Sequence, residues 1–124
     1  MQTFCGTDII EISRIKESIE KKGNRFIEKI FTSEEIEYCE SKNDLKYQHY
    51  AARFASKEAV FKAISTLRIK DISWKDIEIK NDNIGRPIVN ILNKDTAKIQ
   101  NIDLSISHCK EYAVAVAIVE IVGE

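Results

Sequence analysis

Apolar residues in the first third of the chain recur at the spacing of an α-helix, after a short strand expected over residues 3–9. The helical stripe consists of Ile12, Ile15 and Ile19. Gly23 is expected to end this helix, because glycine is the preferred residue just beyond a helix C-terminus. Farther along, Thr32 and Glu35 have the spacing of a capping box, which predicts that a second helix begins there.

The longest expected helix covers residues 47–66, and most of its surface is apolar or alanine. Its central segment, FASKEAVFKAI, nevertheless carries Lys57, Glu58 and Lys62. Glu58 and Lys62 lie one turn apart on one face, where an exposed pair would add only about 0.2–0.5 kcal/mol to helix stability. The alternative is that these charges face a partner, a ligand or a metal, because charges isolated on a largely apolar helix usually do.

The hydrophobic pattern changes to strict alternation in the second half of the chain. The segments DIEIKNDNIGRPIVNIL and DLSISHCKEYAVAVAIVEI each contain two alternating runs around a polar turn, which predicts two antiparallel hairpins. The final run, residues 112–121, is apolar on both faces, so we expect it to be central in a sheet or covered on both sides. Together these elements predict one α+β domain over residues 1–124, with helices packed on a meandering antiparallel sheet.

Composition excludes several classes of protein. The 124 residues carry a net charge of -1, which argues against a nonspecific nucleic-acid binder. No apolar run approaches the roughly 20 residues of a membrane span, and the first residues lack the features of a signal peptide. We therefore expect a cytoplasmic protein with neither a nucleic-acid nor a membrane partner. The three cysteines are too scattered to suggest a disulfide framework or a zinc site: Cys5, Cys39 and Cys109.

Several motifs occur in an order that is specific as a set. GTDIIEISRI, RFASKEAVFKAI and LSISHCKEYAVAVA, with FTSEEIEYC and NDNIGRPIV between them, resemble the signature regions of the holo-acyl-carrier-protein synthases. These are the small bacterial branch of the 4′-phosphopantetheinyl transferases, and the resemblance covers essentially the whole chain. It implies a magnesium-dependent enzyme of fatty acid biosynthesis that moves the phosphopantetheine arm of coenzyme A onto a serine of apo acyl carrier protein. It also implies a homotrimer with active sites between subunits.

The resemblance assigns Asp8 and Glu58 to the metal and Lys62 to catalysis at the pyrophosphate. Magnesium prefers oxygen ligands, usually one or two carboxylates completed by substrate and water, so the residue types fit. Without the resemblance, Asp8 would be better explained as an acid at a helix N-terminus. We favour Glu58, or a water that it orients, as the proton acceptor, with a metal-bound water or a carboxylate of the partner as alternatives.

Two further groups of residues follow from the resemblance. Those expected to bind coenzyme A are Arg53, Lys57, Gly85, Arg86, Pro87, Ser107 and His108. Without the resemblance, Gly85 would be explained by a hairpin turn, and His108 would be a hydrogen-bonded histidine at the end of a strand. Those expected to dock the acidic carrier protein are Arg14, Lys21, Lys22 and Arg25, although interspersed glutamates also suit a plain solvent-facing helix surface.

Two departures from the family pattern bear on the assignment. The chain continues as STLRIKDISW where the family often has a glycine turn, and Cys109 replaces what is often a small hydroxyl or acidic residue. A noncatalytic relative would need a broken metal pair, whereas both carboxylates are present. Broader phosphopantetheinyl transferases, which serve peptide or polyketide carriers, are typically about twice this length.

Overall fold

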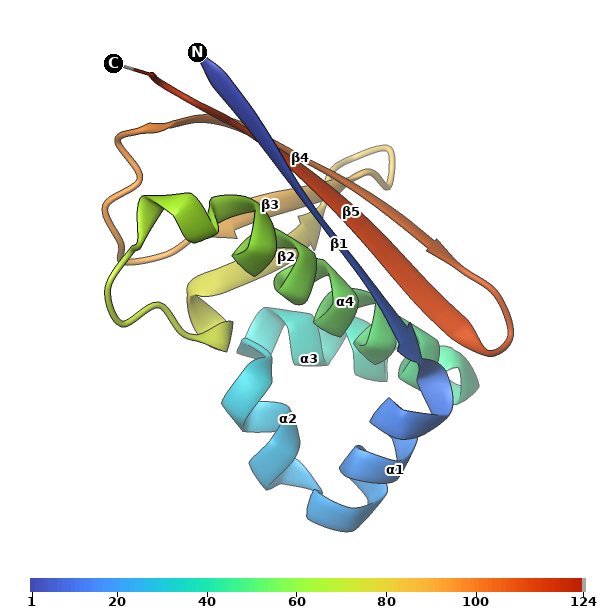
Figure 1. The fold of residues 1–124 in the computed structure, drawn as a ribbon. Coiled ribbons are helices and arrows are strands. Elements are labelled where there is room, and N and C mark those ends of the chain that lie inside the picture. Colours follow the sequence, from blue (N-terminus) through green and yellow to red (C-terminus); the bar gives the residue numbers. More distant parts are fainter. Residues whose placement is uncertain (124) are drawn as a thin grey trace.

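The computed structural model describes residues 1–123 and confirms the α+β class (Figure 1). Strand β1 (Gln2–Glu11) leads into helices α1 (Ile12–Lys22), α2 (Asn24–Ile30), α3 (Ser33–Glu40) and α4 (Lys46–Ile64). Strands β2 (Ile77–Asn81), β3 (Pro87–Ile91), β4 (Ile99–His108) and β5 (Tyr112–Ile121) follow. Short 3-10 turns connect them at Asn43–Leu45, Ser65–Leu67 and Trp74–Asp76. No helix among the described residues is long and apolar enough to cross a membrane.

The strands form two antiparallel sheets instead of the single meander that we expected. The two hairpins are present, but β2 and β3 pair only with each other, and β1 pairs with β5 along its full length. Strand β5 therefore lies between β1 and β4, which confirms its predicted central place. One of its two apolar faces packs against α4, whereas the other exposes Val116 and Ile118.

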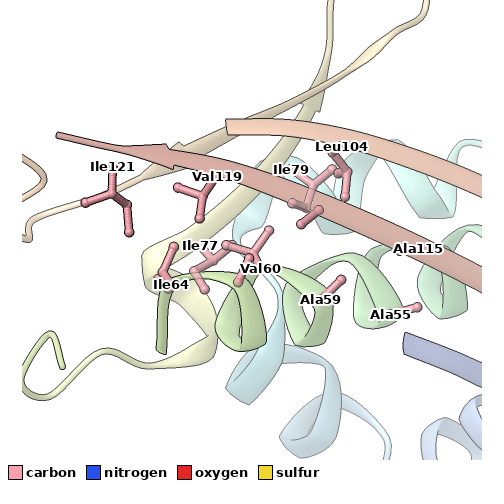
Figure 2. Close-up of a cluster of buried hydrophobic side chains, with 12 residues drawn as sticks. Ala55, Ala59, Val60, Ile64, Ile77, Ile79, Leu104, Ala115, Val119 and Ile121 are labelled. Carbon is pink, nitrogen blue, oxygen red and sulfur yellow. The ribbon is translucent and has the colours of Figure 1, made fainter. Parts of the chain in front are cut away.

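Helix α4 packs along the inner face of the three-stranded sheet (Figure 1). Small residues make this possible, because both elements place buried alanines in one core cluster: Ala55, Ala59 and Ala63 on α4, and Ala115 and Ala117 on β5. Larger side chains fill the end of the interface, where Val60 and Ile64 meet Ile77 of β2 and Val119 of β5 (Figure 2). The core thus lies between α4 and the two sheets.

The first three helices form a second cluster around Tyr50 and Phe31, both fully buried. The capping box is confirmed at the start of α3, where the Thr32 hydroxyl accepts from the Glu35 amide and the Glu35 carboxylate accepts from the Thr32 amide. Helix α2 was not expected from the sequence. Gly23, at a φ of 60°, separates α1 from α2, and the chain resumes a helical course at once.

Gly6 allows β1 to approach α4 more closely than any other residue type would. A Cβ atom at this position would overlap the Ala59 carbonyl oxygen and would lie 2.8 Å from both the Ala63 amide nitrogen and the Lys62 Cβ. Two of these three neighbours are helix backbone, which cannot swing aside as the end of a flexible side chain can. The spacing between β1 and α4 therefore depends on the missing side chain.

We predict that Gly6→Ala lowers the free energy of unfolding by about 1–3 kcal/mol or more, because the added methyl group forces the helix away from the strand. Denaturant unfolding measures this. Gly123→Ala is the matched control, since a Cβ there would meet nothing closer than 3.5 Å. Equal stability of Gly6→Ala and the wild type would mean that the strand and helix are not in close contact in solution.

Candidate active site

Strand β1 carries Asp8, and helix α4 carries two charged residues about 50 positions later in the sequence, Glu58 and Lys62. Asp8 follows Gly6 by two residues and so lies on the same, helix-facing side of β1. The Lys62 ammonium donates to the Thr7 carbonyl over 2.9 Å and lies 3.5 Å from a carboxylate oxygen of Asp8. Glu58 lies one helical turn before Lys62. The close packing at Gly6 thus positions the site.

The pKa of Glu58 reflects the charges of both Asp8 and Lys62. Partial burial raises its pKa, the negative charge of Asp8 raises it further, and the Lys62 ammonium opposes both. Two carboxylates that repel each other, with one exposed lysine beside them, form a donor set that suits a hard divalent cation. No third aspartate, glutamate, histidine or cysteine joins them within residues 1–123. Water and substrate oxygens would complete such a coordination shell, as Mg²⁺ prefers.

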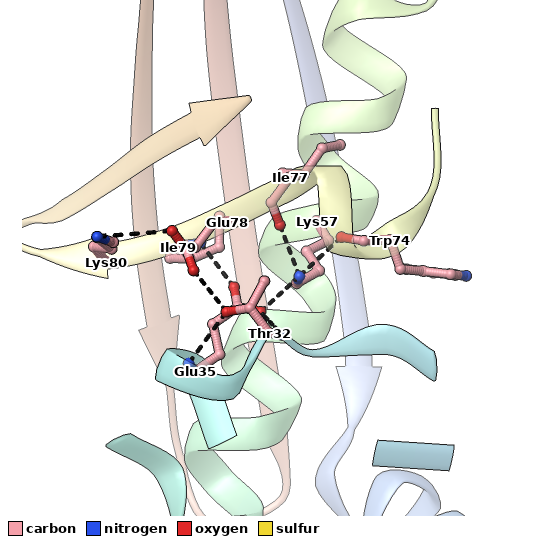
Figure 3. Close-up of polar contacts among 8 residues, drawn as sticks. All are labelled: Thr32, Glu35, Lys57, Trp74, Ile77, Glu78, Ile79 and Lys80. Atoms are coloured by element: carbon pink, nitrogen blue, oxygen red, sulfur yellow. Dashed lines mark hydrogen bonds and ion pairs between the residues drawn. The ribbon is translucent and has the colours of Figure 1, made fainter. Parts of the chain in front are cut away.

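Lys57 does not lie at this site, although the sequence suggested that it contacts coenzyme A. Its side chain is fully buried, and its ammonium lies 2.7 Å from a Glu35 carboxylate oxygen (Figure 3). It also donates to the Trp74 and Ile77 carbonyls over 2.9 and 2.7 Å. An ammonium has three donors, so all are occupied. Burial lowers the pKa of Lys57 while Glu35 opposes that shift. We therefore assign Lys57 a structural role.

Glu35 is the residue at this junction that the sequence revealed only as a helix cap. Besides its capping contact, it accepts a 2.7 Å hydrogen bond from the Ile79 amide of β2. Glu78 adds a second link between the same elements, because its carboxylate accepts from the Thr32 hydroxyl over 2.7 Å (Figure 3). The network joins α3, α4 and β2, and so fixes the β2–β3 hairpin relative to the helix that carries Glu58.

Arg53 supports the turn of that hairpin. It is only 4% exposed, and it donates to the Asn81 side-chain oxygen over 2.8 Å. Asn81 in turn donates to the Gly85 carbonyl over 3.1 Å, and Gly85 has a φ of 85°, which a glycine adopts readily. The expected glycine turn is therefore present before Pro87.

The turn lies on a different side of α4 from the carboxylates. Arg53 and Glu58 are five residues apart, which places them about 140° apart around the helix. No hydrogen bond or ion pair within residues 1–123 joins Gly85, Arg86 or Pro87 to Asp8, Glu58 or Lys62. A single chain thus carries two separate groups of the expected site residues.

Ser107 and His108 close strand β4, and both are exposed. The imidazole of His108 faces that of His49 near the start of α4, with ring centroids 6.2 Å apart. Neither residue contacts the carboxylates, since Asp8 and His108 lie on different strands with β5 between them. Ser107 and His108 therefore lie apart from the carboxylates, as the hairpin turn does.

A basic groove of about 690 Å³ lies beside α1 and α2. Three of the four expected docking residues line it, and a fourth cation, Lys29, was missed by sequence reasoning. Its lining residues are Lys21, Lys22, Arg25, Phe26, Lys29, Ile30, Phe54 and Trp74. Arg14 lies outside the groove, exposed on α1. The groove therefore combines positive charge with an aromatic and apolar floor.

Comparisons with known proteins agree with one another. The model of the 4′-phosphopantetheinyl transferase superfamily matches residues 4–117. The holo-[acyl-carrier-protein] synthase of Ruminiclostridium cellulolyticum is 48% identical, over 98% of this chain and 94% of the relative. The synthase of Chlamydia pneumoniae is 50% identical, over 91% of this chain and 93% of the relative.

Solved structures agree as well. The Bacillus anthracis synthase in complex with coenzyme A has a TM-score of 0.79 and 38% identity, covering 95% of this chain and 96% of that one. The Helicobacter pylori synthase in complex with coenzyme A has a TM-score of 0.80 and 30% identity, covering 94% and 99%.

We predict that Lys57→Met lowers the free energy of unfolding by about 3–5 kcal/mol, because it leaves Glu35 as a buried carboxylate without its cation. Denaturant unfolding at neutral pH measures the loss. Lys21→Met is the control: it breaks an exposed pair with Glu17 and should change stability little. A similar small effect of both substitutions would contradict the structural role of Lys57.

Proposed function

The chain belongs to the 4′-phosphopantetheinyl transferase superfamily, and from that premise we propose that it acts as a holo-[acyl-carrier-protein] synthase. It transfers the 4′-phosphopantetheine arm of coenzyme A to a serine of apo acyl carrier protein and releases adenosine 3′,5′-bisphosphate. The observation that carries this proposal is the convergence of Lys62 with Asp8 and Glu58, in a chain that matches such synthases over nearly its whole length.

The reaction requires a serine hydroxyl to attack a phosphorus atom that already carries negative charge. The serine oxygen bonds to the phosphorus on the pantetheine side, and the bond from that phosphorus to the bridging oxygen breaks. The Lys62 ammonium stabilises the charge that develops on the departing phosphate. The Glu58 carboxylate, or a water that it orients, accepts the serine proton, and its raised pKa makes this carboxylate a stronger base than an ordinary glutamate.

A magnesium ion held by Asp8 and Glu58 would neutralise charge on the pyrophosphate. Such an ion would also relieve the repulsion between the two carboxylates, which Lys62 offsets only in part. The metal pair and the lysine therefore form one functional unit.

Coenzyme A is proposed to bind between two chains of a homotrimer. Asp8, Glu58 and Lys62 of one chain would meet the pyrophosphate, while the second group, from residue 85 to 87 with residues 107 and 108, would come from a neighbour. The outer face of the three-stranded sheet supports this assembly, because it exposes apolar side chains: Ile9, Tyr112, Val116 and Ile118. Such a patch is typical of an interface.

The carrier protein is proposed to dock on the basic groove beside α1 and α2. An acidic partner suits its four cations, and the apolar floor offers an anchoring surface at the centre. The exposed Lys21–Glu17 pair at 2.8 Å moderates the charge at one edge. Arg14 would extend the contact along α1.

The transfer itself is tested by incubating the protein with apo acyl carrier protein, coenzyme A and magnesium, and by following the carrier's intact mass. Wild-type protein should add the phosphopantetheine arm. We predict that Lys62→Ala lowers kcat by on the order of 10² or more while the protein stays folded. Near-normal turnover of this variant would remove Lys62 from the mechanism, and no transfer by the wild type would refute the proposed function.

Docking is tested by reversing Arg14 and Arg25 to Glu. The apparent KM for the carrier should rise more than that for coenzyme A, and the difference should shrink at high salt because screening weakens exposed charges. Lys98→Glu, at the far end of β4 from the helices, is the control. Equal increases for both substrates would point to a different docking face.

Assembly is tested by light scattering at micromolar concentration. A particle of three times the 14.2 kDa chain mass is expected. Ile118→Lys should lower that mass, because it places a charge in the apolar sheet face. A monomer mass for the wild type would refute the trimer.

A further inference from the structure

The β2–β3 hairpin takes its direction from the helices. Within residues 1–123, its two strands pair with each other and form a sheet of their own. Ile77 and Ile79 of β2 are buried in the core, which holds the hairpin against α4 and β5. Hydrophobic contacts are non-directional, so they resist removal of the hairpin far more than they resist its tilting or sliding. The orientation of the hairpin must therefore depend on other contacts.

Three hydrogen bonds of 2.7 Å fasten three consecutive residues of β2 to the helical part of the chain (Figure 3). We call them the base contacts. Each includes a charged group, and such hydrogen bonds are stronger than those between neutral groups. Their donors and acceptors are the Ile79 amide and the Glu35 carboxylate, the Thr32 hydroxyl and the Glu78 carboxylate, and the Lys57 ammonium and the Ile77 carbonyl.

The base contacts lie on the edge of β2 that faces away from β3. Next to the turn, the Asp82 amide donates to the Arg86 carbonyl across the hairpin. Hydrogen bonds between antiparallel strands involve every second residue, so the odd-numbered Ile77 and Ile79 direct their backbone groups to the other edge. Side chains of α3 and α4 therefore take the place of a neighbouring strand along this edge.

The tip of the hairpin, residues 82–86, is internally rigid. The Asp82 side chain accepts from the Ile84 and Arg86 amides over 3.0 and 2.9 Å. The middle of the tip lies about four residues beyond Ile79, which is about 13 Å along the strand direction. A tilt of about 10° at the base would thus move the whole tip by about 2 Å. Displacements of about 1 Å can already cost a binding or catalytic group most of its effect.

We propose that Glu35 and Glu78 are positioning residues, which orient the hairpin tip toward coenzyme A through the base contacts and do not touch the substrate. This inference rests on the proposed function, in which residues 85–87 meet a coenzyme A bound to a neighbouring chain. Glu35 is suited to the role because it is 1% exposed and accepts from both the Thr32 amide and the Ile79 amide. It thereby ties the start of α3 directly to β2.

The reacting centre is positioned by a different set of contacts. Asp8 and Lys62 approach each other where β1 packs closely on α4 at Gly6. Loosening of the base contacts should therefore weaken binding of the nucleotide and leave the turnover of bound substrate unchanged. A loss of stability alone would have the opposite signature, because it lowers the amount of folded enzyme without changing the KM of the molecules that remain folded.

Two substitutions at Glu78 test the base contacts with little disturbance of the core. Glu78→Met removes the acceptor for the Thr32 hydroxyl, whereas Glu78→Gln keeps an oxygen that can accept from it. Calorimetry with adenosine 3′,5′-bisphosphate measures nucleotide binding without transfer. Glu78→Met should raise the Kd for this nucleotide and the KM for coenzyme A by about 3–10-fold, with kcat unchanged. Glu78→Gln should retain the wild-type values.

The double variant Glu35→Gln/Lys57→Met tests the buried part of the base. It removes both charges together, so neither is left uncompensated, and the single glutamine oxygen replaces two carboxylate oxygens that accept from different amides. The KM for coenzyme A should rise by about 10-fold or more, again with kcat unchanged. Ile121→Ala is the control for lost stability, because it removes a core side chain at the end of β5 and should leave the KM unchanged.

The role of Glu78 is refuted if Glu78→Met binds the bisphosphate as tightly as Glu78→Gln does. The role of Glu35 is refuted if the folded double variant keeps the wild-type KM, as Ile121→Ala should. If the double variant does not fold, the two Glu78 variants decide whether the base contacts orient the tip. A wild-type protein that binds no bisphosphate and transfers nothing would refute the proposed function instead, so the two failures are distinguishable.

Discussion

The close approach of β1 to α4 at Gly6 governs the geometry of the reacting centre. Alternate residues of a strand point the same way, so the missing side chain at Gly6 brings Asp8 toward the helix two residues later. The same need for short distances explains the alanines that line α4 and β5. Alanines bury little apolar area, and the larger residues at the end of this interface, Val60 and Ile64, supply much of the missing burial.

The other side of α4 is organised by polar contacts. A buried ion pair seldom adds much net stability compared with well-packed apolar residues, but its hydrogen bonds can be satisfied in only one arrangement. Lys57 and Glu35 meet all of their partners only when α3, α4 and β2 are in register. Arg53 extends this order to the hairpin turn through Asn81. One helix thus positions two groups of residues, by close packing on one face and by polar contacts on the other.

Sequence reasoning succeeded where the signal is local. Helical spacing and the capping box located α1, α3 and α4 to within about two residues, and alternation located both hairpins. The pairing of β1 with β5 has no local signal, because it joins the two ends of the chain. The role of Lys57 also has no local signal. A lysine on an alanine-rich helix produces the same sequence pattern whether its ammonium contacts a ligand or a glutamate that is distant in the sequence. Asp8 and Glu58 are proposed as metal ligands from the family resemblance, and the packing of β1 against α4 places their two elements side by side.

The division of site residues between opposite faces of α4 has a genetic consequence. If coenzyme A lies between chains, a chain defective at Lys62 still contributes an intact hairpin turn and His108 to its neighbour, and a chain defective at His108 still contributes its carboxylates. Two such alleles expressed in one cell would assemble mixed oligomers in which some interfaces combine both intact halves. Complementation between alleles of a single gene would then separate substitutions on the two faces of the helix, whereas two substitutions on one face would fail to complement.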